Sequence, residues 1–165
     1  MTESKLKRLK ISPLVTVKSY NWLKEYKESQ SSMPYQIAPE NSFYKNKRHR
    51  NYLSKWLEAV IMYIITQDGW FAKKVETTGR KVRTKMGKEV WVKSGADKVK
   101  GEPDIQSLIN GSLVYWEVKV GNDRLSKEQK EFIADIESKG AKVHVVKTLD
   151  GFLDQYVNYS DKINW

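Results

Sequence analysis

The feature that most constrains the fold is an Asn110-Gly111 dipeptide between two largely apolar stretches, residues 104–109 and 112–120. Asn-Gly is the preferred pair at the centre of a two-residue hairpin, because both positions need a positive φ angle. The sequence therefore predicts two antiparallel strands in which Ile109 pairs with Ser112. This register places Asp104 directly opposite Glu117, with the two β-carbons about 4.5–5.5 Å apart. Two acids in that position repel each other, which favours a cation between them.

Side-chain alternation along the second strand adds an amine to these acids. One face of the strand is apolar, and the other carries Glu117 and Lys119 on the same side. The carboxylate can hold a metal ion, and the ammonium group can contact a phosphate or a water molecule. The chain has no cysteine and two histidines, so a metal would need oxygen ligands, which favours Mg²⁺ or Mn²⁺. The alternative is a polar residue at a strand start and a surface ion pair along the next strand.

The remaining pattern predicts helices around a mixed β-sheet, in an α/β fold. Apolar residues recur at helical spacing from Leu53 to Ile65, Gly69 follows as a stop signal, and Glu58 borders the apolar stripe. Ser126 starts another helix as its N-cap, and Gly140 ends it. Gln129 shares the apolar face of that helix, so we expect it to point inward; a capping-box role is equally compatible. A short helix at 20–28, extended hairpin-like structure at 70–100, a strand at 142–147 and a final helix at 149–157 complete the prediction.

Positive charge is concentrated in two parts of the chain. The net charge is +10, and residues 1–50 and 70–100 each contribute +7. We interpret residues 1–50 as a basic N-terminal arm and residues 51–165 as the main domain. Basic surface with interspersed aromatic residues favours nucleic-acid binding, although a solvated surface that maintains solubility is the alternative. The candidate phosphate contacts are Arg80, Lys81, Arg83, Lys85, Lys88, Arg124 and Lys127.

The motifs in the second half of the chain resemble those of one nuclease family. Gly101-Glu102-Pro103-Asp104, then Glu117-Val118-Lys119, then a segment from Arg124 to Gln129 are similar to the signature of the virus-type replication-repair nuclease (VRR-NUC) family. That family belongs to the PD-(D/E)XK superfamily. The resemblance covers roughly residues 53–150 and implies a restriction-endonuclease-like core, with a central mixed sheet flanked by helices. Residues 1–50 have no counterpart in it, and residues 77–100 are longer and more basic than the usual connection.

The resemblance also implies roles for individual residues. Asp104 and Glu117 would bind Mg²⁺ or Mn²⁺, and the main-chain carbonyl of Val118 would add a ligand. Lys119 would orient the attacking water or stabilise charge on the phosphate. Glu58 and Gln129 match the carboxylate of the family's helix and the glutamine that follows its second motif.

The expected function is therefore metal-dependent hydrolysis of DNA, with a preference for branched, flapped or junction structures. The main alternative is a DNA-binding module that keeps the nuclease fold without cutting; a third hypothesis is a replication or recombination partner whose basic arm binds protein or RNA. No stretch approaches the roughly 20 apolar residues of a membrane span. We therefore expect a soluble protein in the cytoplasm of a bacterium or a phage-infected host. A homodimer would suit a branched substrate.

Overall fold

The computed structural model describes residues 14–29, 47–75, 80–83, 87–92, 99–163 and 165. Its elements are, in order, α2 (Val17–Ser29), α3 (Lys47–Gln67), β1 (Phe71–Lys74), β2 (Arg80–Arg83), β3 (Glu89–Val92), β4 (Ile105–Ile109), β5 (Ser112–Val118), α4 (Lys127–Ser138), β6 (Lys142–Val146) and α5 (Leu149–Tyr156). Each predicted helix and strand is present, with ends shifted by a few residues. None of the helices in these ranges is long and apolar enough to cross a membrane.

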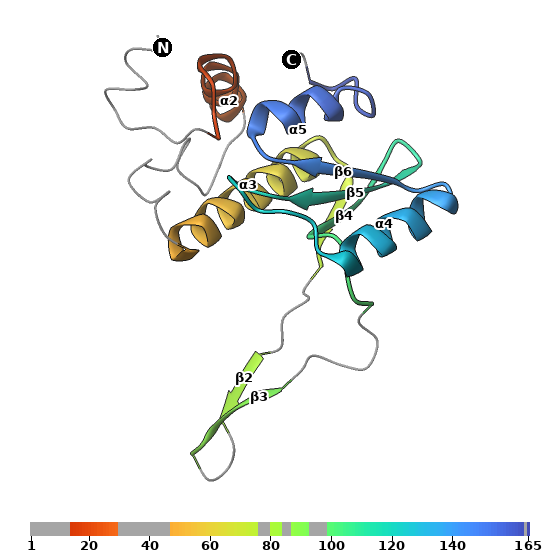
Figure 1. Ribbon diagram of the computed structural model, residues 1–165. Coiled ribbons are helices and arrows are strands. Elements are labelled where there is room, and N and C mark those ends of the chain that lie inside the picture. Colours follow the sequence, from red (N-terminus) through yellow and green to blue (C-terminus); the bar gives the residue numbers. More distant parts are fainter. Residues whose placement is uncertain (1–13, 30–46, 76–79, 84–86, 93–98, 164) are drawn as a thin grey trace.

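Four of the strands form one mixed sheet in the order β1-β4-β5-β6. β4 is antiparallel to both β1 and β5, whereas β6 lies parallel to β5 and follows α4 in the chain. This arrangement confirms the mixed α/β architecture expected of a PD-(D/E)XK core (Figure 1). β2 and β3 pair with each other in a separate two-stranded sheet, as the hairpin-like pattern of residues 70–100 predicted.

The β4–β5 hairpin has the predicted register. Asn110 and Gly111 have φ angles of 46° and 78°, as a tight hairpin turn requires. Ile109 pairs with Ser112 and Ile105 with Trp116, so the next position along β4 faces Glu117. That position is Asp104, which directly precedes the first residue of the strand.

The two faces of the sheet are covered by different helices. The apolar face of β5 is buried: Val114, Trp116 and Val118 are at most 3% exposed. α5 packs there, with the Phe152 ring centred 4.9 Å from that of Trp116. On the opposite face Phe132 of α4 contacts a tyrosine of β5, and Figure 1 shows α4 and α5 on opposite sides of the sheet. The polar residues of β5 therefore lie on the α4 side.

Helix α2 belongs to the same core as the sheet. Leu14 and Leu23 are buried, and the Leu14 carbonyl accepts a hydrogen bond of 2.9 Å from the amide of Leu149. Asp150 accepts hydrogen bonds from the hydroxyl groups of Thr16 (2.5 Å) and Ser19 (2.7 Å), which joins the start of α2 to the start of α5. Residues 14–29 therefore pack as part of the folded body, and α3 spans the expected boundary at residue 50. A division there stays a prediction.

Candidate active site

Glu117 and Lys119 form a buried ion pair at the C-terminal end of β5. Their side chains are 1% and 11% exposed, and Lys119 Nζ lies 2.6 Å from Glu117 Oε1. Alternation along the strand places both on the face that α4 covers, as the sequence predicted. The Lys119 amide donates to the Val146 carbonyl at 2.9 Å, which fixes the backbone against β6. Lys119 Nζ is also 3.8 Å from the exposed Asp123 carboxylate.

Asp104 joins this pair from the neighbouring strand. Its Oδ2 accepts a hydrogen bond of 2.9 Å from the amide of Val118, so the carboxylate is held across the end of the β4–β5 ladder. The Pro103 before it is buried, and the chain enters β4 directly after Asp104. The hairpin register therefore sets the position of both acids, because Ile105 pairs with Trp116 and Asp104 and Glu117 occupy the next positions.

Gln129 connects α4 to the acids. Its Nε2 donates to Glu117 Oε1 at 2.6 Å, while its Oε1 accepts from the Ser126 amide at 3.0 Å. The Gln129 amide in turn donates to the Ser126 hydroxyl at 3.2 Å, which completes a capping box. Gln129 thus has both predicted roles: it completes the capping box of α4, and its side chain also points inward to the sheet. The hydrogen bond from its side-chain amide fixes α4 to Glu117.

Glu58 reaches the same region from α3. The residue is 7% exposed, and its Oε2 forms an ion pair with Nζ of Lys74, the last residue of β1. Burial raises the pKa of Glu58, and the Asp104 carboxylate raises it further, against the hydrogen bond from Lys74. The sequence pattern left Glu58 at the border of an apolar stripe, and the structure turns it inward. Lys74 was not singled out from the sequence, because nothing local distinguishes it from the other basic residues nearby.

The pKa values of Asp104 and Glu117 are raised, as expected where buried acids have too little positive charge nearby. Burial, and then the Asp104 carboxylate, raise the pKa of Glu117 to about 7, although Lys119 and Gln129 oppose the shift. Burial also raises the pKa of Asp104. For Lys119, burial acts to lower the pKa, but the ion pair with Glu117 and the other nearby acids raise it overall. Glu117 Oε2 is buried and has no hydrogen-bond partner.

The donor set fits a hard divalent cation. An unpaired, buried carboxylate oxygen beside a second carboxylate is what an oxygen-ligated Mg²⁺ or Mn²⁺ would use. Among the described residues, however, no three acidic or histidine side chains are already gathered as a metal-binding cluster. In this arrangement lysine ammonium groups contact Glu117 and Glu58. A cation that used the paired oxygens would have to displace these ammonium groups, whereas Glu117 Oε2 is unpaired.

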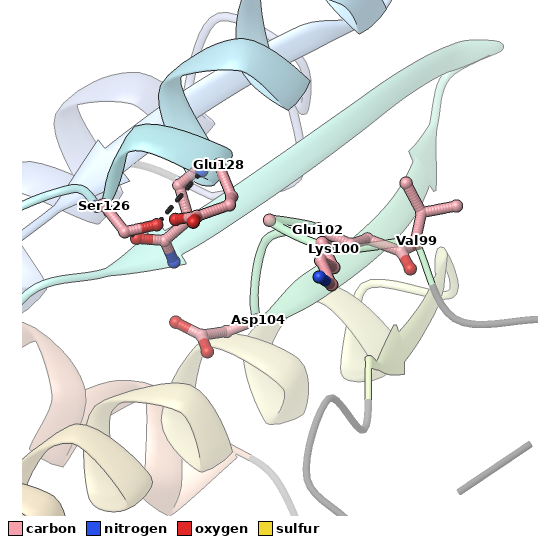
Figure 2. A pocket seen from close by; sticks show the side chains of 8 residues that line it. Val99, Lys100, Glu102, Asp104, Ser126 and Glu128 are labelled. Carbon is pink, nitrogen blue, oxygen red and sulfur yellow. Dashed lines mark hydrogen bonds between the residues drawn. The ribbon is translucent and has the colours of Figure 1, made fainter. Parts of the chain in front are cut away.

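A pocket of about 540 Å³ opens beside Asp104. It is lined by Val99, Lys100, Gly101, Glu102, Asp104, Ser126, Glu128 and Gln129. Figure 2 shows Asp104 on one side of this pocket and Ser126 and Glu128, at the start of α4, on another. The pocket thus runs from one candidate metal ligand to the glutamine that contacts the other.

Gly101 allows the loop before β4 to approach the first turn of α4 closely. Its φ angle is +84°, and a β-carbon there would lie 2.2 Å from the carbonyl oxygen of Glu128 and 2.8 Å from the amide nitrogen of Gln129. Only glycine allows the chain to pass so close to the first turn of α4. The glycine of the Gly101-Glu102-Pro103-Asp104 segment therefore has a packing reason: it lets the loop that carries Asp104 contact the helix that carries Gln129.

The predicted phosphate contacts are not all brought to this site. Arg124 and Lys127 are exposed near the start of α4, and Lys127 Nζ lies 3.7 Å from Glu131. Lys88 is exposed between β2 and β3. Arg80, Lys81 and Arg83 lie on β2, where the structure describes the backbone and not the side chains, and Lys85 lies outside the described residues.

Comparison with known proteins agrees with this geometry. The family model of the VRR-NUC domain matches residues 54–149, more than half of the chain. The matched range contains all five candidate catalytic residues, which are Glu58, Asp104, Glu117, Lys119 and Gln129. No curated protein matches the chain. The chain therefore belongs to the VRR-NUC domain family, whose domain implies a nuclease of the PD-(D/E)XK type with DNA as its substrate.

Proposed function

We propose that this protein is a Mg²⁺- or Mn²⁺-dependent endonuclease that hydrolyses phosphodiester bonds in branched, flapped or junction DNA. One observation carries the metal dependence: Glu117 is buried beside Asp104 with one oxygen unpaired. Buried unsatisfied carboxylate oxygens are costly, and a divalent cation would remove that cost. Family membership supports the choice of nucleic acid as the substrate.

Three residues would hold the cation in this proposal. Asp104 and Glu117 supply carboxylate oxygens, and the main-chain carbonyl of Val118 supplies a third. When bound, such a cation polarises a phosphoryl oxygen and lowers the pKa of a coordinated water molecule. Asp104 is restrained for this task by the Val118 amide.

The other residues act through charge and position. Lys119, largely shielded from solvent, places its ammonium group where negative charge develops on the phosphate. Gln129 restrains the Glu117 carboxylate through its 2.6 Å hydrogen bond. Glu58 adds a carboxylate from α3, near enough to Asp104 for that acid to raise its pKa in addition to the larger effect of burial.

Cleavage assays distinguish this proposal from the alternative of a DNA-binding module that does not cut. The test incubates labelled duplex, single-stranded, flapped and four-way-junction DNA with Mg²⁺, Mn²⁺ or a chelator. We expect cleavage by the wild type with either cation, fastest on the branched substrates, and none with the chelator. Salt-sensitive binding without cleavage under every condition would support the binding module instead.

A second ion pair in the chain provides matched control variants. Lys139 Nζ and Asp135 Oδ2 are also 2.6 Å apart, but this pair is more than half exposed on α4. Glu117→Gln and Lys119→Met should each reduce cleavage by at least about 100-fold, since each removes charge from the reacting site. Asp135→Asn and Lys139→Met should leave the rate unchanged. Equal effects at the two pairs would contradict the site assignment.

The basic residues of the β2–β3 region supply the proposed DNA contacts. Replacing Arg80, Lys81, Arg83, Lys85 and Lys88 by alanine should weaken binding to every DNA form. The dependence of log Kd on log salt concentration should also become shallower, by about 0.9 for each phosphate on duplex DNA that the protein no longer neutralises. An unchanged salt slope would show that these charges do not contact phosphate. The same preparations, analysed by sedimentation, test the prediction of a homodimer.

A further inference from the structure

Lys74 lies where a strand edge meets the candidate site. It is the last residue of β1, and its cross-strand partner is Ile105, the residue after Asp104. Its ammonium group pairs with Glu58, whose side chain is 9% exposed, while the Lys74 side chain itself is 44% exposed. A buried acid on a core helix is thus balanced by an amine from a strand edge.

The two lysines of the site have parallel arrangements. Lys119 pairs with Glu117 as Lys74 pairs with Glu58, and in each pair the acid is more deeply buried than the amine. Both ammonium groups also act on Asp104, where they oppose the effect of burial on its pKa. If all five groups are ionised, three carboxylates and two ammonium groups leave a formal charge of −1 in a mostly buried region.

We propose that Lys74 is the counter-ion that holds Glu58 in the metal-free protein, and that a divalent cation at the site displaces it. This inference rests on the proposed function, because it requires that the site bind a divalent cation. Burying an uncompensated carboxylate is costly, so an acid such as Glu58 needs a positive partner whenever the metal is absent. Lys74 provides that partner without a metal ion.

The mobility expected of the two partners supports displacement of the amine rather than of the acid. Glu58 is anchored in the middle of α3, between Leu57 and Val60, which are fully buried. Lys74 sits on an edge strand with a long flexible side chain that already reaches solvent. A cation near Asp104 and Glu117 would repel the ammonium group and attract the same acids, so Lys74 competes with the metal.

The competition predicts that removing the amine strengthens metal binding. Lys74→Met keeps most of the apolar stem and removes the charge. The Kd for Mn²⁺, measured by calorimetric titration without DNA, should fall by roughly fivefold, the factor expected for loss of one partly exposed ion pair. The melting temperature in a chelator should also fall, because Glu58 is then left buried without its partner. Saturating Mn²⁺ should restore more stability to this variant than to the wild type.

Lys73 provides a matched control on the same strand. It is exposed and adjacent in sequence, and it pairs across the sheet with Gln106 rather than with Ile105. Lys73→Met should leave both the Mn²⁺ affinity and the melting temperature close to the wild-type values. Lys74→Arg, which keeps a cation beside Glu58, should resemble the wild type more closely than Lys74→Met does.

The possible outcomes separate this inference from the proposed function. If the wild type binds Mn²⁺ and Lys74→Met binds it with equal or lower affinity, Lys74 is not a competing counter-ion, and only this inference fails. If the wild type binds no Mn²⁺, or if Glu117→Gln binds it as tightly as the wild type does, the metal site itself is wrong and both fail. A change in Lys73→Met equal to that in Lys74→Met would also overturn the inference, since it would reflect net charge alone.

Discussion

Two buried carboxylate clusters lie along the same helix and differ in how their charge is balanced. Asp68, just beyond the end of α3, is 8% exposed and accepts hydrogen bonds from Tyr26 (3.0 Å), Tyr156 (2.7 Å) and Ser160 (3.4 Å). All three donors are neutral hydroxyl groups. In the middle of α3, by contrast, Glu58 depends on an ammonium group. The Asp68 cluster joins α2, α3, α5 and the segment after α5.

The difference shows how a buried acid is used. Around Asp68 both carboxylate oxygens have hydrogen-bond donors, and burial together with the acid raises the pKa of both tyrosines. Around Glu117 one carboxylate oxygen is unpaired, and the other is paired with the ammonium group of Lys119. A closed network adds stability, whereas an incomplete one keeps binding capacity. Substitutions in the two clusters should therefore affect different measurements.

The largest expected effect is that of Asp104→Asn on cleavage. The amide oxygen can still accept the hydrogen bond from Val118, so the backbone geometry should persist. The charge that would hold the cation is lost, and we expect a fall in cleavage rate of at least about 1000-fold, near 4 kcal/mol of activation free energy. The metal-free protein should be as stable as the wild type or more so, because a like-charge repulsion with Glu117 is removed.

Cleavage kinetics and denaturant unfolding in a chelator check this prediction together. Residual cleavage within tenfold of the wild-type rate would show that Asp104 does not bind the metal. A large loss of stability would instead show that Asp104, like Asp68, mainly stabilises the fold.

Asp68→Ala should have the opposite effects: a large loss of stability and an unchanged cleavage rate. It leaves the buried hydroxyl of Tyr156 and the half-buried hydroxyl of Tyr26 without their acceptor, which should lower the free energy of unfolding by about 3 kcal/mol. At temperatures where the variant remains folded, its cleavage rate should match that of the wild type. Urea unfolding and cleavage at low temperature are the measurements, with Asp154→Asn on the exposed side of α5 as a control. A cleavage defect in folded Asp68→Ala would mean that the two clusters are coupled.

The geometry of the candidate site was predictable where local rules determine it. A two-residue turn at Asn110-Gly111 fixes the hairpin register, so the placement of Asp104 opposite Glu117 followed from turn chemistry and alternation. Gln129 was constrained in the same way by helix periodicity and by the capping box. The family resemblance added the roles of these residues, which no spacing rule supplies.

The features that were missed depend on contacts between distant segments. Leu14 and Leu23 are part of the core, where the Leu14 carbonyl is bound by the amide of Leu149, more than 100 residues later in the chain. The partnership of Lys74 with Glu58 depends on where β1 lies relative to α3, which no local pattern encodes. The close approach of Gly101 to α4 likewise appears only when both segments are in place.

Gly101→Ala tests how tightly the candidate site, formed by Asp104, Glu117 and Gln129, is restrained. The new β-carbon would overlap the backbone of Glu128, and a side chain at φ +84° is itself unfavourable, so the loop and the first turn of α4 must separate. We expect about 2 kcal/mol of lost stability and a reduction in cleavage of roughly tenfold or more, because Gln129 would move away from Glu117. Gly87→Ala, where a β-carbon meets nothing within 4 Å, is the control for positive-φ strain alone. Equal defects in Gly101→Ala and Gly87→Ala would show that the close packing of Gly101 against α4 is not what matters.

The smallest expected effect is a pH dependence of the free energy of unfolding that arises from Glu117. Burial and Asp104 raise the pKa of Glu117 to about 7 in the folded protein, above the ordinary value of 4.5. The folded state thus holds this proton more tightly than the unfolded state. The resulting stabilisation is full below about pH 4.5 and is lost as the pH rises through about 7. In a chelator, the free energy of unfolding of the wild type should therefore fall by about 1–2 kcal/mol relative to that of Glu117→Gln between pH 6 and pH 8. Urea titrations of both proteins at several pH values measure this difference, and Asp135→Asn should run parallel to the wild type. A constant difference between wild type and Glu117→Gln would mean that Glu117 is ionised throughout this range, as the acid of a fully compensated cluster would be.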